Sequence, residues 1–212
     1  MRKRIPELCR AKELRILAAA QRRFASNELA KVTIGDIAGD VKMGKATLYY
    51  YFPTKQDIFK GVIRREQDEF LSEMRRILSR KHSATAKLKA YVERRLRLTR
   101  RLLNLGQFLL RSWNDKPVAY RNMVESFAAR ERDIVAAILA EGQASGEFAV
   151  ESPGRTAAML LHALQGLRLR YAGSNGRRAI LPVRQSDFER EVRLLLQTLL
   201  YGVVNPSHTH TG

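Results

Sequence analysis

Apolar side chains recur every three or four residues along most of the chain, which is the period of a helix with one buried face. The first such stretch ends near Ser26, and a short second one places Ile34, Ile37 and Val41 on a single face. No segment shows the strict alternation of a strand, and no internal repeat is present. The pattern therefore predicts an all-α protein of about nine helices.

Turn and capping residues divide this pattern into separate helices. Pro53 disfavours helical geometry in the residue before it, so a short helix over 45–51 should end at Phe52. Pro153 is well placed to begin a helix, because its missing N–H would have no partner in a first turn. Capping boxes are predicted at Thr33 with Asp36, Thr54 with Asp57, and Ser186 with Glu189. The apolar spacing places the other helices at about 14–26, 58–80, 88–103, 108–113, from 120 to the glycines of 142–146, from 153 onward, and 188–203.

Composition limits the class of protein. The chain has 212 residues, 45% of them hydrophobic, which suits a sizeable core and excludes a disordered chain. Its single cysteine, Cys9, cannot form an internal disulfide and lies in a basic stretch without the apolar centre of a signal peptide. No stretch approaches the roughly 18 apolar residues of a membrane span. A soluble, cytoplasmic protein without membrane insertion is expected.

The charge points to anionic partners. Lys and Arg number 39 against 21 Asp and Glu, a formal net charge of +18, which favours nucleic acid, an anionic membrane or an acidic ligand. Residues 1–60 hold 13 basic and 6 acidic side chains; Arg2, Lys3 and Arg4 form either an arm along a phosphate backbone or a solvated terminus. Residues 75–101 hold 11 basic and one acidic side chain. Solvated helix faces are the first interpretation of this second segment, before attraction of an anionic effector such as an acyl thioester and contact with flanking DNA or membrane.

Two short helices joined by a brief break, after a longer helix, are what a helix-turn-helix DNA reader requires. Leu48 supplies the inward side chain of the second short helix, which leaves its other faces free for contacts. Lys45 can neutralise a phosphate or donate to guanine, and Thr47 can contact a base edge or a thymine methyl.

Three successive tyrosines follow on this helix. Neighbouring side chains point about 100° apart, so the three cannot all face inward. Tyr49 and Tyr50 are assigned to DNA, whereas Tyr51 and Phe52 are assigned to the core.

The stretch from Ile16 to Phe59 resembles the N-terminal domain of TetR-family (TetR/AcrR-like) transcriptional regulators. The likeness is strongest over 33–38, Thr-Ile-Gly-Asp-Ile-Ala, and over 45–55, Lys-Ala-Thr-Leu-Tyr-Tyr-Tyr-Phe-Pro-Thr-Lys. The resemblance implies a helix-turn-helix domain over 1–53, a helical effector-binding and dimerisation domain over 54–205, and a polar tail over 206–212. It also implies DNA contacts, chiefly with phosphates, from Thr33, Lys45, Thr47, Tyr49, Tyr50 and Lys55.

Several positions depart from the family pattern. Lys42 and Glu28 stand where the family usually has glycine, and a non-glycine residue in left-handed geometry costs roughly 1 kcal/mol. Asn27 could take the left-handed conformation in place of the second glycine. Gly44 replaces a common Ser or Thr cap, and Tyr50 a frequent histidine. The fold should tolerate these changes, which concern the turn geometry and the face that reads the operator.

Apolar residues spread widely around the last two long helices, notably over 157–164 and 194–200. A monomer would leave part of this surface exposed. The resemblance implies a homodimer through these two helices, which would place the recognition helices roughly 34 to 36 Å apart in successive major grooves. Burial within one subunit is the alternative.

The resemblance further implies a small-molecule effector, whose binding among the fourth to eighth helices releases a near-palindromic operator. Candidate lining residues are aromatic, sulfur-containing or polar side chains on predicted inward faces: Phe70, Met74, Tyr91, Phe108, Trp113, Met123, Phe127 and His162. Each one taken singly fits plain core better, and Trp113 is the strongest candidate.

No enzyme motif, cofactor or metal site is expected. The chain lacks a glycine-rich phosphate loop and an H-E-x-x-H motif, and His208 and His210 have no further ligands near them in the sequence. The competing function is a basic helical protein that coats nucleic acid or a membrane surface without specificity. Such a protein would bind every duplex alike with a steep salt dependence, whereas a regulator should prefer its own site by about 10³.

Overall fold

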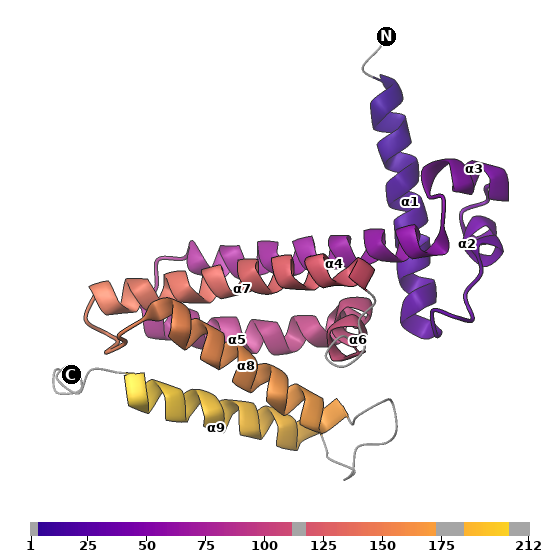
Figure 1. Ribbon diagram of the computed structural model, residues 1–212. Helices are drawn as coiled ribbons and strands as arrows, with labels where there is room; N and C mark the ends of the chain where they lie inside the picture. Colours follow the sequence, from indigo (N-terminus) through magenta and orange to yellow (C-terminus); the bar gives the residue numbers. More distant parts are fainter. Residues whose placement is uncertain (1–3, 112–117, 173–184, 204–212) are drawn as a thin grey trace. The chain divides into compact units, whose positions relative to one another are not determined.

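The structure is a computed structural model that describes residues 4–111, 118–172 and 185–203. These ranges are helical and contain no strand, as predicted (Figure 1). The helices are α1 (Arg4–Ser26), α2 (Ile34–Asp40), α3 (Lys45–Tyr51), α4 (Lys55–Leu78), α5 (Ala84–Arg101), α6 (Leu103–Arg111), α7 (Val118–Ala144), α8 (Pro153–Ala172) and α9 (Gln185–Val203). Among the described helices, none is long and apolar enough to cross a membrane.

The order of the predicted helices is confirmed, and several of their predicted boundaries are wrong. The short helix over 45–51 ends before Phe52 and α8 begins at Pro153, as predicted. However, α1 already includes Arg4, which was predicted as part of a terminal arm. Leu103 begins α6 instead of ending the helix before it. The seventh helix was predicted to end among the glycines of 142–146, and α7 ends there, at Ala144. Ser186 lies inside α9 and is not its cap; a helix start commonly shifts by one or two residues.

Contacts within the chain define two compact units. The first contains Met1–Asp68 together with Leu102–Phe108, and the second contains Glu69–Arg101 and Leu109–Gly212. Helices α4 and α6 therefore contribute residues to both units. The functional boundary expected between residues 53 and 54 concerns the DNA-binding motif and stays a prediction.

The first unit packs α1, α2, α3 and the first half of α4 around one core. Ile16, Ile37, Leu48 and Ile58, one from each helix, have no exposed surface. Gly61 allows α1 to approach α4, because a Cβ there would lie 2.7 Å from Cδ2 of Leu17. The two short helices, α2 and α3, are thus fixed to α1 and α4 by buried apolar side chains, since helices of seven residues are unstable alone.

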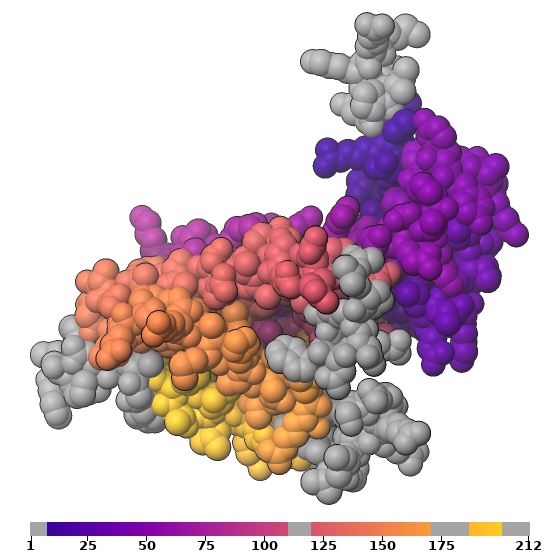
Figure 2. All heavy atoms as spheres, in the orientation of Figure 1, coloured from indigo at the N-terminus to yellow at the C-terminus, as the bar shows by residue number. Residues whose placement is uncertain are grey.

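In the second unit, α5, α7, α8 and α9 pack in a closed order, each against the next and α9 against α5. The side chains of α8 and α9 lie directly against one another (Figure 2). Phe70 from the second half of α4 meets Phe127 of α7 edge to face, with 5.3 Å between ring centroids. The core of this unit is therefore built by the second half of α4 together with later helices such as α7.

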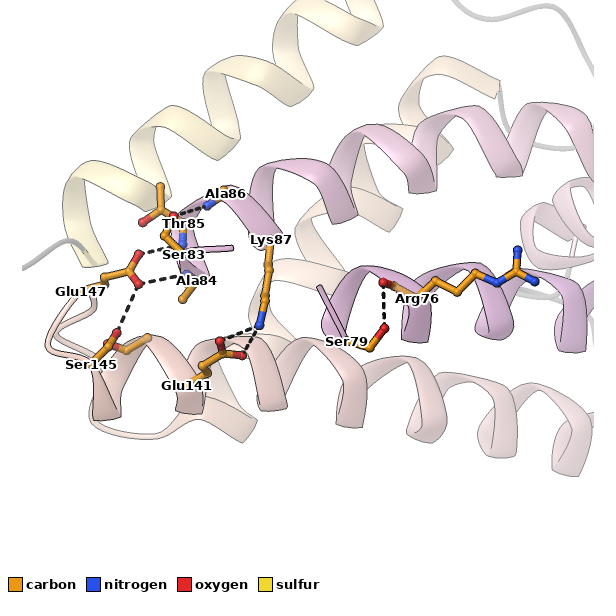
Figure 3. Close-up of polar contacts among 11 residues, drawn as sticks. Arg76, Ser79, Ser83, Ala84, Thr85, Ala86, Lys87, Glu141, Ser145 and Glu147 are labelled. Carbon is orange, nitrogen blue, oxygen red and sulfur yellow. Dashed lines mark hydrogen bonds and ion pairs between the residues drawn. The ribbon is translucent and has the colours of Figure 1, made fainter. Parts of the chain in front are cut away.

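A carboxylate from the loop after α7 caps the start of α5. Oε1 of Glu147 accepts the N–H of Ala84 and Oε2 accepts the N–H of Thr85, each at 3.0 Å (Figure 3). Three residues into α5, the buried ammonium of Lys87 pairs with Glu141 of α7. Anionic groups are stabilised at a helix N-terminus, so these contacts hold α5 to the end of α7.

The Glu147 cap predicts an acid-sensitive contribution to stability. Burial alone would raise the pKa of Glu147, but the N–H groups of Thr85 and Ala84 more than offset this and hold the pKa below its ordinary value of 4.5. A lowered pKa contributes stability that is present above the ordinary value and lost as pH falls through the folded value. We expect Glu147→Gln to lose less stability than the wild type between pH 6 and pH 3, measured by urea unfolding. Glu151→Gln is the control, and an identical pH dependence in all three proteins would contradict the prediction.

Candidate DNA interface

The start of α2 is fixed by a complete capping box. The hydroxyl of Thr33 accepts the N–H of Asp36 at 3.1 Å and donates to Oδ2 of Asp36 at 2.7 Å, and the Thr33 N–H donates to the same oxygen at 2.8 Å. These hydrogen bonds from Thr33 hold the pKa of Asp36 below its usual range. The predicted capping box is confirmed. Because the hydroxyl hydrogen of Thr33 is used inside the protein, its predicted DNA contact would have to use the lone pairs of the oxygen.

Arginines of α1 secure the other end of α2. Arg23 forms a two-point pair with Asp40, in which Nε and Nη2 each lie 2.7 Å from a carboxylate oxygen. The hydrogen bonds from Arg23 keep the pKa of Asp40 low. Arg15 donates from Nη2 to the carbonyl oxygen of Val41 at 3.2 Å. Cations suit the carbonyl end of a helix, so α1 fixes the position of the turn that follows.

The turn between α2 and α3 passes through a left-handed residue. Lys42 has a φ of 52° and is the only non-glycine residue with positive φ in the described ranges. This conformation is the one expected where the family usually has glycine. The suggestion that Asn27 is left-handed is wrong, because its φ is not positive. Asn27 instead continues α1 by one residue, donating its N–H to the carbonyl of Arg23 at 3.0 Å.

Lys42 gives a direct test of the turn. Glycine reaches left-handed geometry without strain, whereas alanine does not. We expect Lys42→Gly to be more stable than Lys42→Ala by about 1 kcal/mol in urea unfolding. Both variants lack the ammonium, so the difference isolates the backbone. Equal stability of the two variants would contradict the left-handed assignment.

The α3 helix buries Leu48, partly buries Tyr51 and exposes its other side chains. Leu48 has no exposed surface, whereas Tyr49 is 49% and Tyr50 80% exposed, and Lys45 and Thr47 are also exposed. The four side chains assigned to DNA on α3 therefore lie on its accessible faces. Gly44 caps α3 without a side-chain hydrogen bond, which leaves the first N–H groups of the helix available to a phosphate.

Tyr51 and Phe52 are partly buried against the core of the first unit, as predicted. The rings of Tyr50 and Tyr51 meet edge to face with centroids 5.3 Å apart. Partial burial, with a hydrogen bond to the thiol of Cys9, raises the pKa of Tyr51. The ring of Tyr51 thus packs against the ring of Tyr50, and its hydroxyl links α3 to Cys9 in α1.

Lys55 has a role inside the protein. Its ammonium donates to the carbonyl oxygens of Leu29 and Val32 at 2.9 Å and of Ala30 at 3.3 Å. An ammonium has three N–H groups, and all three are used here. Lys55 therefore holds the loop between α1 and α2, and a phosphate could bind it only by displacing a carbonyl. Its predicted DNA contact remains a prediction without support from this geometry.

Sequence reasoning missed the role of Gly35. A Cβ on Gly35 would lie 2.9 Å from Cε of Lys45, so the side chain of Lys45 crosses the first turn of α2. A small residue two positions after the Thr33 cap is the only sequence signal, and the sequence does not show which side chain packs against it. The close approach places the Lys45 ammonium beside the N-terminus of α2.

The candidate effector residues do not form one group. Phe70, Met74, Tyr91 and Phe127 are buried in the second unit, and Met123 is partly buried there. Phe108 belongs to the first unit, where its ring lies 6.1 Å from that of Phe59. Trp113 lies outside the described residues. The prediction that His162 faces inward is wrong, because its side chain is exposed.

The basic segment 75–101 is only in part a solvated face. Lys87 and Arg95 are buried, 5% and 6% exposed, and each is paired with a carboxylate of α7. Arg97 and Arg100 line a groove of about 710 Å³ between α5 and α9, and Arg100 pairs with Glu189 across it at 2.7 Å. The basic residues of this segment therefore serve in two ways: some form buried ion pairs within the unit, and others line the groove between α5 and α9.

A buried polar network in the second unit also escaped sequence reasoning. Glu131 of α7 accepts hydrogen bonds from Tyr91 and Arg95 of α5, and Arg168 of α8 interacts electrostatically with this pair. A signal for Arg168 exists, because it follows buried Leu161 and Leu164 at helical spacing and so continues the inward face of α8.

Comparison with known proteins gives consistent results. The family profile described as "Bacterial regulatory proteins, tetR family" matches residues 16–62. A crystal structure of a transcriptional regulator from Cytophaga hutchinsonii ATCC 33406 is 38% identical, with a TM-score of 0.76 over 90% of this chain and 97% of that one. The "Fatty acid metabolism regulator protein" of Bacillus subtilis (strain 168) is 25% identical over 139 residues, covering 66% of this chain and 72% of that protein.

A third relative shares the fold alone. It is the transcriptional regulator FadR of Bacillus subtilis, solved in complex with stearoyl-CoA, which is 19% identical with a TM-score of 0.69 over 89% of this chain and 98% of that one. The matched profile covers the whole α2–turn–α3 element described above. From this element, the nine-helix order of the described chain and the relative at 38% identity, the chain belongs to the tetR family of bacterial regulatory proteins, which are DNA-binding regulators of transcription.

Proposed function

We propose that this regulator is a homodimeric repressor that leaves a near-palindromic operator when a small molecule binds to its second unit. The observation that carries the proposal is the face of α3, where a fully buried Leu48 fixes the helix while Lys45, Thr47, Tyr49 and Tyr50 remain accessible. A recognition helix needs this division between an anchored face and a reading face.

We assign separate roles to these four residues. Lys45 contributes charge to a phosphate or donates to guanine, and Thr47 reads a base edge or a thymine methyl. The hydroxyl groups of Tyr49 and Tyr50 extend further and bind phosphate oxygens. Thr33 and Lys55 act mainly by holding α2 and the preceding loop, since their polar groups already have partners.

Apolar surface on the last two helices supports the dimer. Met159 of α8 is 68% exposed and Leu194 of α9 is 61% exposed. Large apolar side chains exposed on adjacent helices are typical of a surface that a second copy covers. A two-fold axis through this surface would present two α3 helices to two half-sites of the operator.

The effector acts through helices that belong to both units. Because α4 and α6 each contribute to the two units, a ligand that shifts their second-unit ends can alter how α3 reaches DNA. The related FadR structure contains stearoyl-CoA, so long-chain acyl compounds are the first class to screen. As a regulator of transcription the protein works in the cytoplasm, where the DNA lies.

Selection of bound duplexes from a random pool at near-physiological salt tests the proposed function. Enrichment of a near-palindrome, bound about 10³ more tightly than a scrambled duplex, is the expected result. Equal, salt-sensitive binding to every duplex would overturn the proposal and favour a nonspecific polyanion-binding protein.

Single substitutions on α3 then test the contact assignments. Thr47→Ala and Tyr49→Phe each remove one polar group from an exposed side chain, so helix content and stability should not change. Each should weaken binding to the selected duplex by about 1 to 3 kcal/mol, measured by fluorescence anisotropy. Ser72→Ala, another exposed hydroxyl on α4, is the control. Unchanged affinity in both variants would remove Thr47 and Tyr49 from the interface.

A further inference from the structure

One arginine of α8 has a buried nitrogen atom without a hydrogen-bond partner. Nη1 of Arg168 is buried, and within the described ranges no group accepts a hydrogen bond from it. Buried polar groups in folded proteins are nearly always hydrogen-bonded, because leaving one unpaired loses its hydration without replacement. The residue as a whole is partly exposed, unlike the buried Arg95.

The charges near Arg168 do not balance. Oε1 of Glu131 accepts Nε–H of Arg95 at 2.8 Å and the hydroxyl of Tyr91 at 2.6 Å. Arg168 interacts electrostatically with both Arg95 and Glu131, so two guanidinium groups share one carboxylate that already has two donors. Burial, with repulsion from Arg95, lowers the pKa of Arg168 to about 10, and the group stays charged at neutral pH.

Apolar side chains adjoin this positive cluster. Phe127 precedes Glu131 by one turn on α7, and its ring centroid lies 5.3 Å from that of Phe70. Phe70 and Met74, one turn apart on α4, are buried in the same core. An excess positive charge therefore borders an interior of aromatic and sulfur-containing side chains, which can repack around a flexible apolar ligand.

We propose that Arg168 binds the acid group of the effector, and that the effector is an apolar molecule with a single carboxylate or phosphate at one end. An oxyanion next to Nη1 would supply the missing hydrogen-bond acceptor and a negative charge to balance the guanidinium of Arg168. Such charge-assisted hydrogen bonds are stronger than neutral ones. The apolar remainder of the molecule would lie beside Phe70 and Phe127, whose buried side chains would repack around it. The inference rests on the proposed function, since it concerns the molecule that releases the operator.

Binding of a fluorescent fatty acid to the full-length protein tests this inference. The probe is dansylaminoundecanoic acid, with its methyl ester as the neutral analogue, and dodecanoate and dodecyl phosphate compete against it below their micelle concentrations. Arg168→Met should weaken binding of the acid by about tenfold or more, while the ester binds both proteins equally weakly. Comparing dodecanoate with dodecyl phosphate then distinguishes the two acid groups.

Two control variants separate a binding role from a structural one. Arg170→Met removes an exposed arginine two residues along α8, and Arg97→Met removes one from the groove between α5 and α9. Neither should change the dissociation constant of the acid. Without ligand, Arg168→Met should melt no lower than the wild type, because it removes a largely buried cation that repels Arg95. It should also bind the selected operator with unchanged affinity.

Three results from the comparison of variants and ligands would overturn the inference. They are equal affinity of wild type and Arg168→Met for the acid, equal affinity of the wild type for acid and ester, and a loss of binding in Arg97→Met alone. A protein that binds its operator selectively but none of these acids would also overturn it and leave the proposed function intact. Failure to prefer any duplex would instead show that the proposed function itself is wrong.

Discussion

Glu131→Gln is expected to lower the free energy of unfolding of the second unit by about 3 to 5 kcal/mol, because breaking a buried ion pair leaves an uncompensated charge. Glu131 is 4% exposed and receives both the Tyr91 hydroxyl and Nε of Arg95. Burial alone would lower the pKa of Arg95, and the charge of Glu131 instead raises it above its ordinary value. Without that charge, Arg95 and Arg168 repel one another in the core with no carboxylate between them.

Urea unfolding at two protein concentrations measures this effect apart from any change in dimerisation. The double variant Arg95→Met/Glu131→Met removes both charges and should recover much of the lost stability, since replacing both partners by apolar groups is often nearly neutral. Adding Arg168→Met to Glu131→Gln should recover part of it by removing the second cation. A loss below about 1 kcal/mol in Glu131→Gln, the range of exposed pairs, would show that the pair is solvated in solution.

The DNA-binding element could be predicted from sequence because its determinants are local. The Thr33 cap, the end of α3 before Pro53 and the left-handed Lys42 each depend on neighbours within a few residues, and all three are confirmed. Exposure of Tyr49 and Tyr50 followed from helical geometry once Leu48 was placed inward. Local rules are reliable where helices are short and turns are tight.

The second unit was less predictable because its polar groups pair over long distances in the sequence. Arg95 and Glu131 are 36 residues apart, and Arg95 belonged to a segment interpreted first as solvated helix faces until the fold placed it beside Glu131. Lys55 was missed for the same reason, since its carbonyl partners lie 23 to 26 residues earlier in the chain. A charged side chain gives no sequence signal of burial when its partner belongs to another helix.

Glu66→Leu is expected to lower the free energy of unfolding of the first unit by about 3 kcal/mol or more, since three donors would lose their buried acceptor. Glu66 of α4 is 1% exposed. Its Oε1 accepts the side-chain amides of Gln21 at 2.9 Å and Asn104 at 2.8 Å, and its Oε2 accepts the backbone N–H of Leu105 at 2.7 Å. One carboxylate thus connects α1, α4 and the start of α6, where a negative charge also suits the helix dipole.

A matched variant distinguishes the lost acceptor from lost packing. Gln21→Leu/Glu66→Leu/Asn104→Leu removes the two side-chain donors together with the carboxylate and should unfold at higher urea than Glu66→Leu alone, because apolar groups then face each other. Affinity for the operator should fall in Glu66→Leu, since α1 carries the arginines that fix α2 and the turn before α3. If the triple variant is no more stable than the single one, the cost comes from volume and not from unpaired donors. In that case Glu66 would fill space in the core, and α6 would be held to the first unit by apolar contacts such as that of Phe108 with Phe59.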